Sequence, residues 1–287
     1  MSRILAVGIA TLDIINTVAS YPPEDAEVRA TSQRVCRGGN ATNTLVVLSQ
    51  LGHQCAWAGT LALEPDATHI RADLDYHKID ITAVKHLPHG KVPTSYIALS
   101  QTTASRTIVH YRDLPEYDFD SFAQLDLRHF DWLHFEGRNV AETEHMLVHA
   151  RRVAPNVPIS VEIEKPRDDI KRLFAYADVL LLSRHYCLAR GVTTVDAVPG
   201  LVRSLNPNAN IFLGWGTEGG YAWNSDNVRA HAPAFAPERV VDTLGAGDTF
   251  NAGVIDALLR DATVPDALTV AVRLAGRKCG MMGLAGL

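Results

Sequence analysis

The length, composition and charge of the chain favour one large folded domain and exclude several classes of function. Its 287 residues are 47% hydrophobic and 21% charged, which supports a large core and argues against intrinsic disorder. The net charge of −5 and the pI of about 6.2 give no reason to expect nucleic acid or an anionic membrane as a partner. A ligand that carries phosphate would therefore have to be held by local groups.

The cysteines and the N-terminal residues point to a protein of the cytoplasm. The four cysteines, Cys36, Cys55, Cys187 and Cys279, form no Cys-x-x-Cys pair, which argues against a zinc site or a disulfide framework. The first ten residues lack the longer apolar core of a signal peptide, and no apolar run approaches the length of a membrane span. We therefore expect a cytoplasmic location and no membrane partner.

Apolar strand-like runs alternate with helical patterns along most of the chain. Strands are expected at Ile4–Gly8, Cys55–Gly59, Trp132–Phe135, Pro158–Ile163, Val179–Leu182 and Asn210–Leu213. Helices are expected at Gly39–Leu51, Glu142–Val153, Asp168–Ala175, Val195–Leu205, Ala246–Leu259 and Pro265–Gly276. This alternation predicts a three-layer α/β/α, Rossmann-like parallel sheet with helices on both faces.

Two β-rich segments interrupt this alternation. Residues 13–35 contain two extended runs around a turn at Tyr21–Asp25, and residues 92–111 contain strands at Ser95–Leu99 and Arg106–Tyr111, joined by a polar turn at 101–105. We predict that these segments form a small β-sheet lid over a cleft of the large domain, which comprises residues 1–12, 36–91 and 112–287. An ordinary extension of the sheet edge is the alternative.

The most specific motif is the string Asp242–Phe250, in which Gly245-Ala246-Gly247 leads into an apolar helix. A helix start presents unpaired backbone N–H groups and the positive end of the helix dipole, so these three residues predict an anion hole for a phosphoryl group. Asp248 follows in the first helical turn, where a carboxylate can accept the proton of an attacking hydroxyl. The alternative is an ordinary helix-capping Asp after a glycine turn.

A second motif, Arg37–Asn43, also leads from two glycines into a helix. Asn40 and Asn43 lie three residues apart, so both amides can face one ligand, and amides suit the hydroxyls of a sugar. Asp13 follows the first strand, and ligands of open parallel sheets bind beyond the carboxyl ends of the strands. A helix cap and a solvated turn are the respective alternatives.

Other familiar motifs are absent or incomplete. Gly214–Gly219 matches Gly-x-Gly-x-x-Gly, but residues 220–232 look like a β-hairpin rather than the helix that a dinucleotide site needs, so we expect at most a nucleotide-lining loop. The sequence contains no Gly-x-x-x-x-Gly-Lys-Ser/Thr loop. Glu162 and Glu164 alternate at a strand end, where they either bind Mg²⁺ through water or face solvent.

These motifs resemble the signatures of the ribokinase/phosphofructokinase-B carbohydrate kinase family, and the resemblance extends over essentially the whole chain. Within that family the chain is most similar to the ketohexokinases. The strings that carry the similarity are Tyr21–Asp25, Arg37–Ala41, Glu136–Asn139, Glu162–Arg167, Arg239–Asn251 and Gly276–Gly280. Thr217 and Ala236–Glu238 depart from the ketohexokinase pattern in the nucleotide region, so the preferred nucleoside triphosphate stays open.

The resemblance implies an ATP-dependent sugar kinase that uses Mg²⁺, with a monovalent cation such as K⁺ near Asp242. It implies that Asp248 is the catalytic base and that Gly245, Ala246 and Gly247 form the anion hole. Sugar-binding positions would be Asp13, Gly39, Asn40, Asn43 and Arg106, together with Asp25 reaching the partner subunit's site in a homodimer clasped through the lids. ATP-binding positions would be Gly216, Thr217, Gly219 and Cys279.

The substrate expected from this resemblance is a ketohexose, with fructose converted to fructose 1-phosphate. The alternatives are a related kinase acting on ribose, a nucleoside or a sugar phosphate, a nicotinamide-dependent oxidoreductase resting on Gly214–Gly219, and a non-catalytic sugar sensor. The intact Asp248 argues against the sensor.

Overall fold

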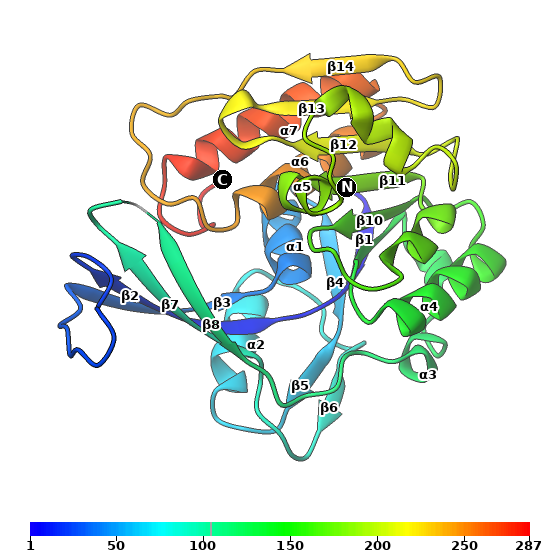
Figure 1. Cartoon of the computed structure of the whole chain (residues 1–287). Helices are drawn as coiled ribbons and strands as arrows, with labels where there is room; N and C mark the ends of the chain where they lie inside the picture. Colours follow the sequence, from blue (N-terminus) through cyan, green and yellow to red (C-terminus); the bar gives the residue numbers. More distant parts are fainter. Residues whose placement is uncertain (104) are drawn as a thin grey trace.

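The computed structural model of the chain describes residues 1–103 and 105–287. Ala104, in the turn expected at 101–105, lies outside the described residues. The described part forms one large mixed sheet, a separate four-stranded sheet and a small two-stranded sheet (Figure 1). The expected α/β architecture is therefore confirmed, with one difference at the edge of the large sheet.

The large sheet has the strand order β14-β13-β12-β11-β10-β9-β1-β4. The strands from β12 to β4 in this order run parallel, whereas β13 and β14 form an antiparallel hairpin at the edge. Its strands are β1 Arg3–Val7, β4 Gln54–Ala58, β9 Trp132–Glu136, β10 Ile159–Ile163, β11 Val179–Ser183, β12 Asn210–Gly214, β13 Gly220–Trp223 and β14 Arg229–Ala232.

Helices cover both faces of this sheet and bury its central strands on both sides. Strands β9 and β10 are buried along their whole length, as expected for parallel strands between two helical layers. Helices α1, α6 and α7 pack on one face, and α4, α5 and their neighbours pack on the other. The helices and 3₁₀ turns are α1 Asn40–Gln50, α2 Ala67–Tyr76, α3 Phe119–Phe122, η1 Leu127–His129, α4 Val140–Val153, η2 Ile170–Tyr176, α5 Arg184–Ala189, η3 Val195–Leu201, η4 Gly216–Glu218, α6 Ala246–Leu259 and α7 Val264–Cys279.

The four-stranded sheet combines segments from two distant parts of the sequence, in the order β3-β2-β7-β8. Its strands are β2 Thr11–Val18, β3 Ser32–Gly38, β7 Thr94–Ser100 and β8 Arg106–Tyr111. In Figure 1 this sheet projects from the large domain and lies opposite the C-terminal segments, with a gap between the two ribbons. Strand β3 extends to Gly38 and ends directly before the first residues of α1.

Several elements differ from the sequence-based predictions. The helices expected at 168–175 and 195–205 are 3₁₀ turns, η2 and η3, and η3 contains Pro199, which has no N–H for a regular helical hydrogen bond. Helix α2 and the two short strands β5 Thr60–Ala62 and β6 Lys85–Leu87 were not predicted. The hairpin expected at 220–232 is present as β13 and β14.

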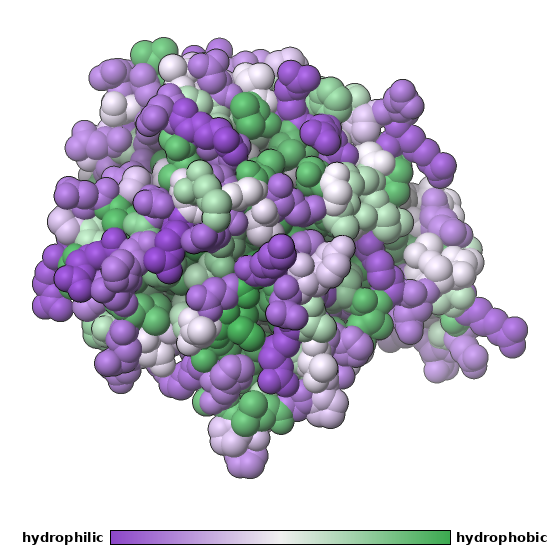
Figure 2. Space-filling view, turned by 180° about the vertical axis from the view of Figure 1, so that it is seen from behind, coloured by the Kyte–Doolittle hydropathy of each residue, from purple (hydrophilic) through white to green (hydrophobic). Residues whose placement is uncertain are grey.

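The surface is of mixed polarity, as expected for a sheet enclosed between two helical layers. Figure 2 shows hydrophobic residues scattered among hydrophilic ones on the face opposite to that of Figure 1. Within residues 1–103 and 105–287, no helix has the length and apolar character needed to cross a membrane.

Candidate active site

The start of α6 forms an open cradle of backbone N–H groups. Gly245 is the N-cap residue with a φ of 80°, a left-handed conformation that favours glycine. In the described chain, the N–H groups of Gly245 and Gly247 have no hydrogen-bond acceptor. A Cβ atom at Gly247 would meet no atom within 4 Å, so the space on that side of Gly247 is open. This geometry suits an anion at a helix N-terminus.

Asp248 lies at this helix start and is joined to α1. Its side chain is buried, and its Oδ2 accepts a hydrogen bond of 2.6 Å from Nδ2 of Asn43. The orientation of the Asn43 amide is fixed by Arg37, whose Nη1 donates to Asn43 Oδ1 at 2.7 Å. Arg37 is itself held by Asp73 of α2 and by the Thr42 hydroxyl oxygen, at 2.5 and 3.0 Å. The sequence placed Arg37 in a motif but gave it no role.

The environment of Asp248 prepares it to exchange a proton near neutral pH. Burial raises its pKa to about 7, while the hydrogen bond from Asn43 opposes the rise and the charges of Glu164 and Glu136 add to it. A carboxylate with a pKa near the working pH is a suitable general base. The same burial hides the Asp248 side chain from bulk water.

Glu162 occupies a different environment from the one its sequence suggested. Its residue is only 6% exposed, and its Oε1 accepts hydrogen bonds from Nδ2 of Asn251 at 2.9 Å and from Nδ2 of Asn40 at 3.2 Å. It therefore does not face solvent. Glu164 is more open, and its Oε2 accepts a second bond from Asn40 at 3.2 Å.

Asp13 and the glycines before α1 form the base of the four-stranded sheet. Thr11 Oγ1 donates to Asp13 Oδ1 at 2.8 Å, and a Cβ at Gly38 would lie 2.1 Å from Asp13 Oδ2, so only glycine leaves room for this carboxylate. Burial raises the pKa of Asp13, and the Thr11 hydrogen bond opposes that rise. Gly39 has a φ of 103° and packs against the carbonyl oxygen of Ile9.

Asp242 anchors the loop before the N–H cradle. Its Oδ1 accepts from the Leu244 N–H at 2.9 Å, and its Oδ2 accepts from the Gly283 N–H at 3.1 Å and from Arg34 Nη2 at 3.2 Å. The fully buried Lys278 Nζ donates to the Asp242 carbonyl oxygen at 2.7 Å and lies 3.4 Å from Oδ2. Burial would raise the pKa of Asp242, but the two backbone N–H donors and the Lys278 charge lower it.

The four-stranded sheet contacts this loop at two points. Arg34 of β3 reaches Asp242, and Arg106 of β8 donates from Nη1 to Thr243 Oγ1 at 3.4 Å. Both arginines therefore join that sheet to the loop before α6. Neither the Arg34 nor the Lys278 contact was expected, because each joins segments far apart in the sequence.

The remaining predicted residues belong to the β12–β13 turn, the end of α7 and the β2–β3 loop. Gly216, Thr217 and Gly219 belong to the turn between β12 and β13, where open space next to Gly216 leaves room for a ligand. Cys279 ends α7, and its carbonyl oxygen accepts from the N–H groups of Val241 and Asp242 at 2.8 and 3.3 Å. Asp25 lies in the exposed loop between β2 and β3, in a left-handed turn, and has no hydrogen bond to Asp248 in the described chain.

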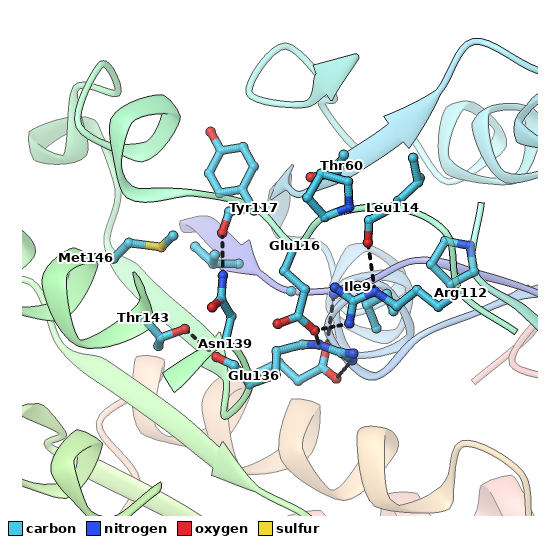
Figure 3. A pocket seen from close by; sticks show the side chains of 15 residues that line it. Ile9, Thr60, Arg112, Leu114, Glu116, Tyr117, Glu136, Asn139, Thr143 and Met146 are labelled. Carbon is cyan, nitrogen blue, oxygen red and sulfur yellow. Dashed lines mark hydrogen bonds and ion pairs between the residues drawn. The ribbon is translucent and has the colours of Figure 1, made fainter. Parts of the chain in front are cut away.

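A small pocket lined by both charged and apolar residues lies where the chain returns from β8 to the large sheet (Figure 3). Arg138 crosses it and donates to Glu116 Oε1 at 2.5 Å and to Glu136 Oε1 at 2.7 Å, while Arg112 pairs with Glu116. Glu136 Oε2 accepts from the Ile9 N–H at 3.0 Å. This ion network ties the base of the four-stranded sheet to the ends of β1 and β9.

Comparison with known proteins decides the family. The model of the pfkB family carbohydrate kinases matches residues 1–285 of the chain. The chain belongs to this family. It is 41% identical to ketohexokinase of Mus musculus over 293 residues, which covers 99% of the chain and 98% of that protein. It is 24% identical to ribokinase of Bacillus subtilis over 291 residues, with 100% and 96% covered.

Solved structures show the same fold in this family. A putative ribokinase from Agrobacterium tumefaciens has a TM-score of 0.87 at 21% identity and covers 99% of the chain, with 94% of its own length matched. Arabidopsis thaliana ribokinase, solved with ribose and ATP, has a TM-score of 0.82 at 17% identity, with 98% and 94% covered. The family and the mouse relative together support a sugar kinase, and the ribokinase-like fold predicted from the sequence is confirmed.

Proposed function

We propose that the chain transfers the γ-phosphate of ATP to a primary hydroxyl of a ketohexose, converting fructose to fructose 1-phosphate. The observation that carries the proposal is the position of Asp248, a buried acid hydrogen-bonded to Asn43 beside unpaired N–H groups at the start of α6. The identity of 41% with a mouse ketohexokinase over nearly the whole chain supports this choice of sugar.

The sugar would lie under the four-stranded sheet, against Asp13, Gly39, Asn40 and Asn43. Asp248 accepts the proton of the attacking hydroxyl, while its hydrogen bond from Asn43 keeps the carboxylate oriented. The N–H groups of Gly245, Ala246 and Gly247 then stabilise the charge that develops on the transferred phosphoryl group. The Ala246 N–H is only weakly engaged, at 3.3 Å from the Thr243 carbonyl oxygen.

ATP would bind along the C-terminal half of the sheet, between the turn of Gly216, Thr217 and Gly219 and the end of α7 at Cys279. Within the described residues, no group of three His, Cys, Asp or Glu side chains could hold a metal ion. Mg²⁺ would therefore enter with ATP, held by phosphate oxygens and water, and would supply neutralisation of the phosphate charge. The protein groups named above align the phosphates with the hydroxyl.

A monovalent cation such as K⁺ near Asp242 would have to share the Asp242 carboxylate with two positively charged side chains. Arg34 and Lys278 already interact with the carboxylate Oδ2 of Asp242. A cation that used this carboxylate would compete with both positive side chains. Turnover measured with and without K⁺, in buffers of a bulky organic cation, tests whether any such site operates.

The four-stranded sheet would act as a lid and as the contact surface of a homodimer. One of its faces exposes Val35, Tyr96 and Val109, which lie in a cross-strand row with the partly buried Ile14. Covering this row with a second copy would remove apolar surface from water. Asp25, in the exposed loop between β2 and β3, would then reach the partner's sugar.

The decisive experiment measures ADP release with a panel of ketoses, aldoses, ribose, nucleosides and sugar phosphates. Fructose should give the highest kcat/KM, with the product phosphorylated at C1. Asp248→Asn should lower kcat by roughly 10² to 10⁴ while sugar binding persists, because a positioned general base contributes about that factor. Near-normal turnover by Asp248→Asn would refute the role of Asp248, and preference for another acceptor would reassign the substrate.

A further inference from the structure

Glu162 is a buried carboxyl group that joins two helices of the site. It lies at the end of β10 and reaches the first turn of α1 through Asn40 and the second turn of α6 through Asn251, both bonded to its Oε1. Its Oε2 is sealed from solvent and has no hydrogen-bond partner in the described part of the chain. None of the roles proposed for the other residues of the site involves this carboxyl group.

The charges around Glu162 disfavour its ionised form. Glu136 is its cross-strand neighbour on β9, but Glu136 is neutralised by Arg138 and accepts the Ile9 N–H (Figure 3). Glu162 has no ion-pair partner among the described residues, and the other acids that face it are Asp248 and Glu164. An unpaired buried charge is costly, so burial and these acids raise the pKa of Glu162 well above its usual value.

The bonds of Glu162 run beside the bond of the base. Asn40 and Asn43 lie one turn apart on α1, and Asp248 and Asn251 lie one turn apart on α6. One connection joins Asn43 directly to Asp248, and the second joins Asn40 to Asn251 through Glu162. The second connection therefore fixes the relative position of the two helix starts that bring Asn43 and Asp248 together.

We propose that Glu162 is a positioning residue that holds the starts of α1 and α6 in register for the proposed base Asp248. The inference rests on the proposed function, because it concerns the same base. Glu162 would act through Asn40 and Asn251, without touching the sugar or the phosphate. Glu162 Oε1 accepts both hydrogen bonds and so holds the two helix starts together. This does not require a negative charge on Glu162.

The test compares Glu162→Gln with Glu162→Ala in the full chain. Glutamine keeps an oxygen that accepts both amide bonds, so Glu162→Gln should retain kcat within about fivefold. It should also leave the acidic limb of the kcat/KM pH profile where it is in the wild type. Alanine removes both bonds, so Glu162→Ala should lower kcat by roughly 10- to 100-fold, as a small misplacement of reacting groups does. The KM for ATP should change little.

The outcomes separate this inference from the proposed function. Glu162→Gln as impaired as Glu162→Ala, or an acidic limb shifted downward in Glu162→Gln, would mean that the negative charge matters and would overturn the inference. Glu162→Ala within twofold of wild type would overturn it as well. If Glu162→Ala does not fold, as judged by circular dichroism, Asn251→Ala replaces it with the same expected direction. Asp248→Asn, assayed in parallel, reports on the base alone.

Discussion

Asn43 and Asp248 are 205 positions apart in the sequence, yet their side chains meet at 2.6 Å from Nδ2 to Oδ2. The bond connects the start of α1, which follows the four-stranded sheet, with the start of α6, which follows the loop anchored by Asp242. Because Arg37 occupies the Asn43 oxygen, the amide can only donate toward Asp248. The proposed sugar-binding residue and the proposed base therefore form one unit.

Loss of this bond should move the pH dependence of the enzyme. The Asn43 hydrogen bond lowers the pKa of Asp248 against the effect of burial, so Asn43→Ala should shift the acidic limb of kcat/KM to higher pH. A hydrogen bond to a charged group is worth about 1.5–3 kcal/mol, which corresponds to a loss of about 10- to 100-fold in kcat/KM at pH 7. Ser49→Ala, on the far end of α1, is the control and should leave the profile unchanged.

The wild-type pH profile follows from the same carboxyl group. A base must be unprotonated to accept a proton, and burial raises the pKa of Asp248 to about 7. We therefore expect kcat/KM to rise with pH up to a limb near pH 7, with a slope of about tenfold per pH unit below it. A profile that is flat between pH 5.5 and 8, measured with coupling enzymes in excess, would contradict the assignment.

The elements that the sequence predicts well have strong local signals. Helix α6 begins and ends at the residues expected from its sequence, 246 and 259, because a glycine cap leads into a long apolar segment. Helix α2 was missed because only Ala67, Ile70 and Leu74 of its ten residues are buried and its N-cap makes no side-chain hydrogen bond. Strands β5 and β6 contain three residues each, too few for a periodic pattern.

The candidate site likewise contains some features that the sequence could predict and others that it could not. The N–H cradle of Gly245 and Gly247 could be predicted because glycines before a helix are visible in the sequence. The interactions of Arg37 with Asp73, of Lys278 with Asp242 and of Glu162 with Asn251 could not, because each depends on how distant elements pack. The surroundings that raise the pKa of Asp248 are of this second kind.

Two glycines in the proposed site should respond differently to alanine. Gly39 has a φ of 103°, and a Cβ there would lie 2.2 Å from the Ile9 carbonyl oxygen, so Gly39→Ala should destabilise the fold by about 1–3 kcal/mol. A Cβ at Gly247 meets nothing within 4 Å, so Gly247→Ala should fold normally but add a methyl group next to the N–H groups proposed to bind the phosphoryl group. Thermal unfolding and kcat, measured for both variants, check this; full activity of Gly247→Ala would argue against the anion hole.

Replacing Asp248 should stabilise the protein at alkaline pH. Asp248 has a folded-state pKa of about 7, against an ordinary value of 3.8, so the folded state binds more protons between these pH values and its stability falls as pH rises through them. Asparagine removes the buried charge and keeps an oxygen that can accept from Asn43. At pH 8, Asp248→Asn should therefore raise the free energy of unfolding by on the order of 1 kcal/mol and Tm by about 2–4 °C.

Asp256, eight positions further along α6, provides the control of opposite sign. Burial would raise its pKa, but hydrogen bonds from His53 and Arg260 lower it, so its ionised form stabilises the fold and Asp256→Asn should lower Tm at pH 8. Calorimetry of both variants at pH 5 and pH 8 checks the pair. The gain from Asp248→Asn should shrink at pH 5, because the wild-type Asp248 is then protonated, and a gain equal at both pH values would show that the charge of Asp248 is not its source.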